Sequence, residues 1–177
     1  MLGKHNVFLV GPMGSGKSAV GRHLARLLRY RFLDSDADIE ASTGVDIAFI
    51  FEKEGEAGFR HREKESIDRL TRLEHIVLAT GGGAVIDPDN RRALAERGTV
   101  VYLETSVAQQ IERTRHTRHR PLLNQGDAGQ KLAELMQRRA ALYAEVADLK
   151  VSTDGRRVAM VADEIYHALK AWPRQAL

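Results

Sequence analysis

The segment Gly11-Pro12-Met13-Gly14-Ser15-Gly16-Lys17-Ser18 fits the phosphate-binding pattern G-x-x-x-x-G-K-[ST]. An apolar run at residues 6–10, typical of a short buried strand, precedes it, and residues 18–30 follow with apolar side chains at helical spacing. The backbone N–H groups of such a loop and the positive end of the helix dipole attract phosphate. The pattern therefore predicts a nucleoside triphosphate site, in which Lys17 reaches the β- and γ-phosphates and the Ser18 hydroxyl is a ligand of Mg²⁺.

Short apolar segments alternate with longer helical patterns along the rest of the chain. Further strands are predicted at residues 31–34, 76–79, 100–103 and 150–152, and further helices at 37–43, 45–54, 56–73, 88–97, 107–115, 130–145 and 158–171. Continuously apolar strands are typical of a parallel sheet that is covered on both faces. We predict an α/β fold with three layers, α/β/α, around a five-stranded parallel sheet, as in P-loop NTPases and nucleoside monophosphate kinases, and a single domain over residues 1–177.

Composition excludes several classes of protein. The 177 residues include no cysteine, which rules out disulfides, zinc–thiolate sites and thiol catalysis and suits a reducing compartment. No apolar run approaches the roughly 18 residues that a membrane helix needs, and the net charge of +3 does not demand a nucleic-acid partner. We therefore expect a cytoplasmic protein without membrane or nucleic-acid partners, and a monomer because no surplus apolar stripe suggests a large interface.

Two carboxylates follow the second predicted strand. If that strand continues briefly, Asp34 and Asp36 project from one face, beyond the carboxyl end of the strand and beside the phosphate loop. Phosphoryl transfer to an alcohol needs one carboxylate for the Mg²⁺ shell and another to accept the proton of the hydroxyl. The alternative is an ordinary acidic turn that caps a helix starting near Asp38. The neighbouring phosphate loop favours the functional interpretation.

On a set of motifs spread over almost the whole chain, the sequence resembles the shikimate kinase family. The motifs are the phosphate loop, Phe32-x-Asp34-x-Asp36-x-x-Ile39-Glu40, Phe59-Arg60-x-x-Glu63, Gly81-Gly82-Gly83-Ala84, Arg120-Pro121-Leu122-Leu123 and Arg139-x-x-x-Tyr143. The phosphate loop alone marks only a superfamily, whereas the ordered set is specific. The resemblance implies that ATP, with Mg²⁺, phosphorylates the 3-hydroxyl of shikimate, a step in aromatic amino-acid biosynthesis.

The resemblance also implies roles for individual residues. Catalysis is assigned to Lys17, Asp36 and Arg120, with Asp36 as the base. ATP binding is assigned to Gly14, Ser15, Gly16, Lys17, Ser18, Ala19, Arg113, Arg120 and Arg156, and Mg²⁺ binding to Ser18 and Asp34. Shikimate binding is assigned to Asp36, Phe51, Phe59, Arg60, Gly81, Gly82, Gly83 and Arg139, with the acceptor-binding segment at about 34–63.

The physical chemistry of these residue types agrees with those roles in several cases. The guanidinium forks of Arg60 and Arg139 suit a carboxylate better than a lysine would, and Glu63, three residues after Arg60, can orient it. Core packing is an equally good interpretation of Phe51 and Phe59. By its position on a basic helix face, Arg139 would be taken as solvated; only the motif singles it out.

A basic cluster, Arg113, Arg115, Arg118 and Arg120, opens the least regular segment of the chain. Such a cluster can bind nucleic acid, but here no aromatic residues are interleaved with it. Next to a triphosphate site we expect instead a mobile lid, at about 113–129, that excludes water and brings Arg120 to the phosphates.

Two other functions compete with a shikimate kinase. A P-loop kinase for gluconate or a nucleoside monophosphate would share the loop but not the acceptor-side set Asp36, Arg60, Gly82 and Arg139. A GTP-dependent switch would need an Asn-Lys-x-Asp signature, and no asparagine of the chain precedes a lysine.

Overall fold

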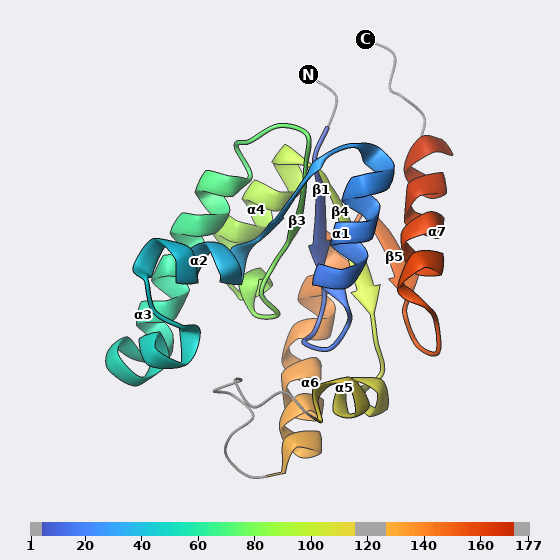
Figure 1. Ribbon diagram of the computed structural model, residues 1–177. Coiled ribbons are helices and arrows are strands. Elements are labelled where there is room, and N and C mark those ends of the chain that lie inside the picture. Colours follow the sequence, from blue (N-terminus) through green and yellow to red (C-terminus); the bar gives the residue numbers. More distant parts are fainter. Residues whose placement is uncertain (1–4, 116–126, 172–177) are drawn as a thin grey trace.

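A five-stranded parallel sheet forms the centre of the computed structural model, which describes residues 5–115 and 127–171 (Figure 1). The strand order is β2-β3-β1-β4-β5, and both neighbours of β1 are parallel to it, with Val7 opposite Val77 on one side and Thr99 on the other. The predicted sheet is confirmed, including its weakly patterned last strand. The strands are β1 (Val7–Val10), β2 (Arg31–Asp34), β3 (Ile76–Ala79), β4 (Thr99–Glu104) and β5 (Leu149–Ser152).

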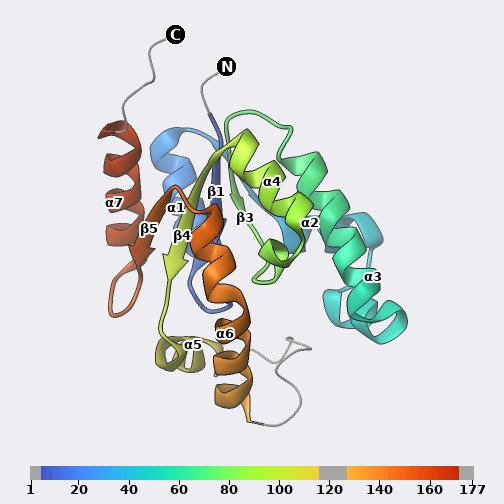
Figure 2. The same ribbon diagram turned by 180° about the vertical axis from the view of Figure 1, so that it is seen from behind.

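Helices cover both faces of the sheet and complete the predicted three layers. Helices α1 and α7 lie on one face, and α3, α4 and α6 on the other (Figures 1 and 2). A short 3₁₀ helix, Ala84–Ile86, was not predicted. The α-helices are α1 (Lys17–Leu28), α2 (Ser35–Thr43), α3 (Ile47–Leu70), α4 (Pro88–Arg97), α5 (Val107–Thr114), α6 (Ala128–Val146) and α7 (Val158–Ala171).

The alternation of side chains along β1 explains why both faces need a cover. Val7 and Leu9 pack with α1 and α7, whereas Phe8 and Val10 pack with the helices of the opposite face, and all four are buried. Each fully buried side chain of this size stabilises the fold by roughly 1.5–3 kcal/mol. A continuously apolar strand is therefore stable only between two helical layers.

A sharp kink divides α3 into the two helices that the sequence predicts. Gly55 adopts φ 69° and ψ −175°, a backbone conformation that is essentially restricted to glycine. The predicted boundary between residues 54 and 56 is thus confirmed. The kink turns the part of α3 that carries Phe51 away from the part that carries Arg60.

The strand order determines where a ligand can bind. The chain leaves β1 toward β2 on one side of the sheet, and its later strands β4 and β5 lie on the other. In open parallel sheets, the crevice at such a reversal, beyond the carboxyl ends of the strands, is the usual binding site. Among the described residues, no helix has the length and apolar character to cross a bilayer.

Candidate active site

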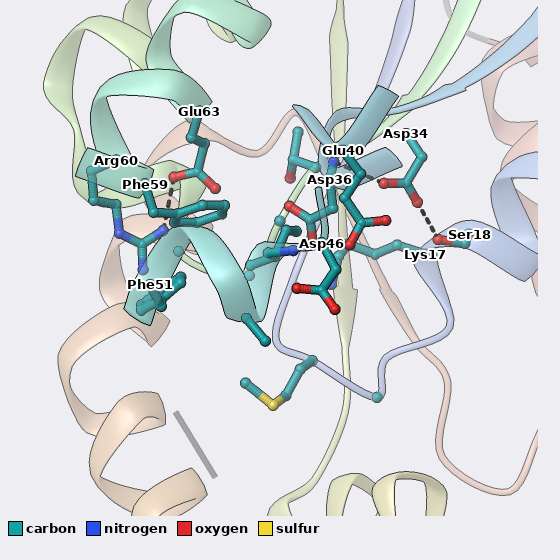
Figure 3. Close-up of a pocket in the computed structure, with 18 of the residues that line it drawn as sticks. Lys17, Ser18, Asp34, Asp36, Glu40, Asp46, Phe51, Phe59, Arg60 and Glu63 are labelled. Carbon is teal, nitrogen blue, oxygen red and sulfur yellow. Dashed lines mark hydrogen bonds and ion pairs between the residues drawn. The ribbon is translucent and has the colours of Figure 1, made fainter. Parts of the chain in front are cut away.

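A cavity of about 740 Å³ opens at the carboxyl ends of β1, β2 and β3 (Figure 3). It combines the phosphate loop with residues of α2, of both parts of α3, of the glycine run and of α6. Most of the predicted site residues line it: Gly14, Gly16, Lys17, Ser18, Ala19, Asp34, Asp36, Phe51, Phe59, Arg60, Gly81, Gly82, Gly83, Arg113 and Arg139. Segments far apart in the sequence therefore converge on the phosphate loop, as predicted.

The phosphate loop has the local geometry that its pattern predicts. Gly16 caps the start of α1 with φ 85°, a left-handed conformation that glycine adopts without steric cost. The Lys17 amine donates hydrogen bonds to the Gly11 carbonyl (2.7 Å) and the Pro12 carbonyl (2.8 Å). It also donates to the Ser15 hydroxyl at 3.3 Å, so Ser15 lies behind the loop rather than in the lining of the cavity. The lysine charge is thus held at the floor of the site.

Asp34 joins the phosphate loop to α2. Its Oδ2 accepts the Ser18 hydroxyl at 2.6 Å, and its Oδ1 accepts the backbone N–H groups of Asp36 (3.0 Å) and Ala37 (3.2 Å). The strand ends at Asp34, as predicted, and α2 begins at Ser35, so the condition under which both carboxylates would project from one face of a strand is not met. Asp34 is both a helix cap and a partner of Ser18, but the helix that it caps starts at Ser35 rather than near Asp38. The role of Asp34 in the Mg²⁺ shell stays a prediction.

Asp36 reaches the cavity from the first turn of α2 rather than from an extended strand. Figure 3 shows its carboxylate directed into the cavity, as is the side chain of Lys17. A Cβ built on Gly81 would lie 2.8 Å from Asp36 Oδ1, so the carboxylate packs directly against the glycine run. The prediction was correct in placing Asp36 at the site and wrong in the reason.

Arg60 and Glu63 form a buried ion pair on one wall. Arg60 donates to Glu63 Oε1 at 2.8 Å and to the exposed Glu56 at 3.2 Å. Burial raises the pKa of Glu63, whose side chain is 1% exposed, and the charge of Arg60 counteracts only part of that rise. Burial alone would lower the pKa of Arg60, but the carboxylates of Glu63 and Glu56 outweigh it and leave it raised. The predicted orientation of Arg60 by Glu63 is present.

Two polar atoms of this pair lack a partner. Arg60 Nε and Glu63 Oε2 are buried and make no hydrogen bond to any part of the chain that the structure describes. Native proteins rarely leave such groups unsatisfied, because each costs about 1–3 kcal/mol. Unsatisfied polar atoms in the wall of a cavity are typical of a site built for a polar ligand.

The glycine run, residues 81–83, allows close packing of side chains and does not adopt a left-handed backbone conformation. A Cβ on Gly83 would lie 2.4 Å from both terminal nitrogens of Arg60, and one on Gly81 would lie 2.8 Å from Glu63 Oε2. Gly83 itself has φ −96°, which any residue can adopt. The resemblance assigns the run to shikimate binding, which stays a prediction. In the structure it lets the polar side chains of the site approach it.

Arg139 is buried, contrary to what its position on a basic helix face indicates. It is 5% exposed and lines the cavity, whereas the adjacent Arg138 is exposed. One turn later, the Tyr143 hydroxyl donates to the Gly82 carbonyl at 2.5 Å, which ties α6 to the glycine run. Burial raises the pKa of Tyr143 to about 12. Among the sequence signals, only the Arg-x-x-x-Tyr motif marked these two residues.

Phe51 and Phe59 both line the cavity and pack in or against a small core, while their contact with the substrate stays a prediction. Their rings pack 4.9 Å apart and line the cavity, while Phe59 also belongs to a small core with Ile39 and Ile50. The Arg60 guanidinium lies 5.3 Å from the centre of the Phe59 ring. The aromatic wall is thus held by the same core that joins α2 to α3.

The three arginines predicted to bind ATP have different outcomes. Arg113 lines the cavity and donates to the Gly14 carbonyl at 3.0 Å and to the Thr153 carbonyl at 2.9 Å. Arg156 is not among the residues lining the cavity, because its guanidinium is bound to the Ser152 carbonyl and the Glu164 carboxylate. Arg120 lies outside the described residues, as does most of the predicted lid at 113–129.

Sequence reasoning missed several polar groups in the cavity. Glu40 and Asp46 line it, and each also accepts a backbone N–H at the start of α3, from Ile47 and Phe49 respectively. Glu40 could have been found from the sequence, because it belongs to the motif that ends in Ile39-Glu40. Asp46 stands where an N-cap residue is expected, three positions before the N–H that it accepts.

A family model described as shikimate kinase matches residues 13–170. A shikimate kinase of Halorhodospira halophila is 56% identical over 94% of this chain and 94% of its own length. A shikimate kinase structure from Acinetobacter baumannii in complex with shikimate has a TM-score of 0.92 and 48% identity, covering 93% of this chain and 92% of that one. A shikimate kinase from Aquifex aeolicus has a TM-score of 0.81 and 34% identity, covering 93% and 96%.

Proposed function

The chain belongs to the shikimate kinase family, and on that premise we propose how its residues share the transfer of the ATP γ-phosphoryl group to the 3-hydroxyl of shikimate. One observation carries the proposal: Asp36, Arg60 and Arg139 line the same cavity as the phosphate loop. Phosphoryl transfer needs little covalent help from the protein, so positioning and charge do most of the work.

The acceptor lies between the α3 wall and the phosphate loop. Its carboxylate pairs with the guanidinium groups of Arg60 and Arg139, since two forks give parallel charge-assisted bonds. The Arg60 side chain is 21% exposed and lines the cavity, so part of its guanidinium can meet such a ligand. Phe51 and Phe59 contact the apolar ring. This arrangement should favour a small hydroxylated carboxylic acid over a nucleotide acceptor.

The chemical step exchanges one P–O bond for another. The 3-hydroxyl oxygen attacks the γ-phosphorus, the bond to the ADP oxygen breaks, and the hydroxyl proton passes to the Asp36 carboxylate. Lys17 neutralises charge on the transferring group from the floor of the site, and Arg120 does so from the lid. The lid, at about 113–129, excludes water that would otherwise receive the phosphoryl group.

The residues at the Ser18–Asp34 contact fit a magnesium ion. Both offer oxygen ligands of the kind that Mg²⁺ prefers, and the two oxygen atoms lie 2.6 Å apart. Among the described residues, no group of three or more acidic or histidine side chains could hold a metal by itself. Mg²⁺ is usually held by one or two protein oxygens together with substrate phosphates and water. When bound, Mg²⁺ would neutralise charge on the β- and γ-phosphates, and Ser18 and Asp34 would be the residues that hold it.

We further propose that the chain acts as a single-domain monomer in the cytoplasm. One chain supplies both the phosphate loop and the proposed acceptor residues that line the described cavity, which supports a site that functions within a single copy. Sedimentation or light scattering at assay concentration tests the monomer.

Release of ADP in the presence of Mg-ATP tests the function directly. Shikimate should stimulate ADP release strongly over water alone, and gluconate and nucleoside monophosphates should not. Asp36→Asn should lower turnover by roughly 10²–10⁴-fold, because it removes the proton acceptor while keeping the shape. A near-wild-type rate in this variant would exclude Asp36 as the base, and stimulation by another acceptor would exclude the substrate assignment.

A further inference from the structure

A polar cluster lies just outside the cavity, where α2 contacts α3. Asp38, on α2, accepts the Ser66 hydroxyl at 2.6 Å and the Arg69 guanidinium at 2.5 and 3.2 Å. Ser66 is 3% exposed, and the Asp38 side chain is 23% exposed. The bond between Asp38 and Arg69 uses both carboxylate oxygens and both terminal nitrogens, which fixes the relative orientation of the two helices.

This cluster lies close in sequence to the acceptor residues on both helices. Asp38 is two residues after Asp36 on α2, and Ser66 is three residues after Glu63 on α3. Asp36 and Glu63 meet at Gly81, because a Cβ there would lie 2.8 Å from a carboxylate oxygen of each. The polar contacts between α2 and α3 thus continue from the cavity into the cluster.

Two other contacts hold α2 against α3: a small apolar core, and Glu40, which accepts the Ile47 N–H at 3.1 Å. Among the nine residues of α2, only Ile39 contributes a buried apolar side chain, in a small core with Ile50 and Phe59. A helix this short is not stable without tertiary contacts. Because this apolar core is small, the cluster of Asp38, Ser66 and Arg69 adds directional polar contacts that help to set how α2 lies on α3.

We propose that Asp38, Ser66 and Arg69 are positioning residues for the acceptor, because they set the separation between Asp36 on α2 and Arg60 on α3. This inference rests on the proposed assignment of Asp36 and Arg60 to shikimate. The cluster touches neither substrate; it acts through the two helices that carry the acceptor groups. Its loss should weaken productive binding of shikimate and leave the ATP side, built on β1 and α1, unaffected.

Steady-state kinetics on the full chain, with each substrate varied in turn, separates these effects. Asp38→Ala should raise KM for shikimate about tenfold, the size expected for coupled neighbours, and change KM for ATP by less than about twofold. Arg69→Lys keeps the charge but loses the guanidinium fork, so its KM for shikimate should lie between those of the wild type and Asp38→Ala. Arg72→Ala is the matched control: Arg72 is an exposed arginine just beyond α3 that pairs with Asp68 instead.

Other variants keep the outcome interpretable. If Asp38→Ala does not fold, Ser66→Ala removes one hydrogen bond, leaves the ion pair, and should still raise KM for shikimate. The inference is overturned if KM for shikimate in both variants, or in the one that folds, equals that of Arg72→Ala. It is also overturned if KM for ATP rises by the same factor as KM for shikimate. Arg60→Ala and Asp36→Asn are measured alongside. If these two leave shikimate kinetics unchanged, the assignment of the acceptor site fails; if they act while the cluster variants do not, only the positioning role fails.

Discussion

Replacing Gly83 by alanine should damage shikimate binding without damaging the fold. A Cβ at this position would lie 2.4 Å from both terminal nitrogens of Arg60 and 2.6 Å from its Cζ. Ordinary contacts begin near 3.4 Å, so the guanidinium must retreat by about 1 Å, the difference between 3.4 and 2.4 Å. That movement strains its 2.8 Å bond to Glu63 and misplaces the fork that receives the substrate carboxylate.

The expected magnitudes differ sharply between function and stability. A misplacement of about 1 Å can cost as much as a hundredfold, so KM for shikimate should rise roughly 10- to 100-fold. The backbone at residue 83, with φ −96° and ψ 3°, accepts alanine. Replacing glycine by alanine lowers the conformational entropy of the unfolded chain and so stabilises the fold by about 0.4–1 kcal/mol. This gain offsets the destabilisation from the strained ion pair. The free energy of unfolding should therefore change by less than about 1 kcal/mol.

A double-mutant cycle tests this reasoning. ADP release is measured at saturating ATP over a range of shikimate concentrations, and unfolding is followed in urea. Because the added methyl acts through Arg60, it should have little further effect on KM in an Arg60→Ala background. Equal effects of Gly83→Ala in the wild-type and Arg60→Ala backgrounds would refute the steric argument, as would an unchanged KM in the single variant.

Three further predictions concern the pKa of Tyr143, the nucleotide side and the metal. The raised pKa of Tyr143 means that the stability from its neutral phenol is complete below pH 10 and is lost as the pH rises through about 12. Urea unfolding between pH 9 and 12 should show a loss, approaching roughly 2–3 kcal/mol, that is absent from Tyr143→Phe; parallel curves would contradict the shift. Arg113→Ala removes the link between Gly14 and Thr153 and should raise KM for ATP about tenfold while leaving KM for shikimate unchanged; an equal rise in both would contradict it. Asp34→Asn keeps a good helix cap but loses the charge, so half-maximal activity should need at least about tenfold more Mg²⁺; an unchanged requirement would remove Asp34 from the metal site.

Local patterns made the donor side of the site predictable. The residues from Gly11 to Ser18 are contiguous, and their geometry follows from one loop between a strand and a helix. Asp34 and Asp36 could be placed beside it because parallel strands end at the same edge of the sheet. Even so, periodicity did not reveal that α2 begins at Ser35.

Contacts between distant segments were not predictable from periodicity. Arg138 and Arg139 are adjacent and chemically identical, yet only the second is buried, because α6 turns it toward the cavity and the Tyr143 anchor at Gly82. The packing of Gly83 against Arg60, and of Asp38 against Ser66, depends on how helices cross rather than on any local pattern. Arg139 was found only through a motif, and Arg156, suggested by resemblance alone, is bound elsewhere.

The central position of β1 also has consequences during synthesis of the chain. The strand that precedes the phosphate loop is made first, but its two neighbours in the sheet are β3 and β4, and β4 ends only at Glu104. At about 5–20 residues per second, a ribosome needs roughly 5–20 s to make the stretch from β1 to the end of β4. Until β3 has been made, the apolar side chains of Val7–Val10 have no neighbouring strand, and one edge of β1 stays open until β4 follows. The nascent chain should therefore depend on chaperones at its amino-terminal end, and the ATP site should form late although its residues emerge early.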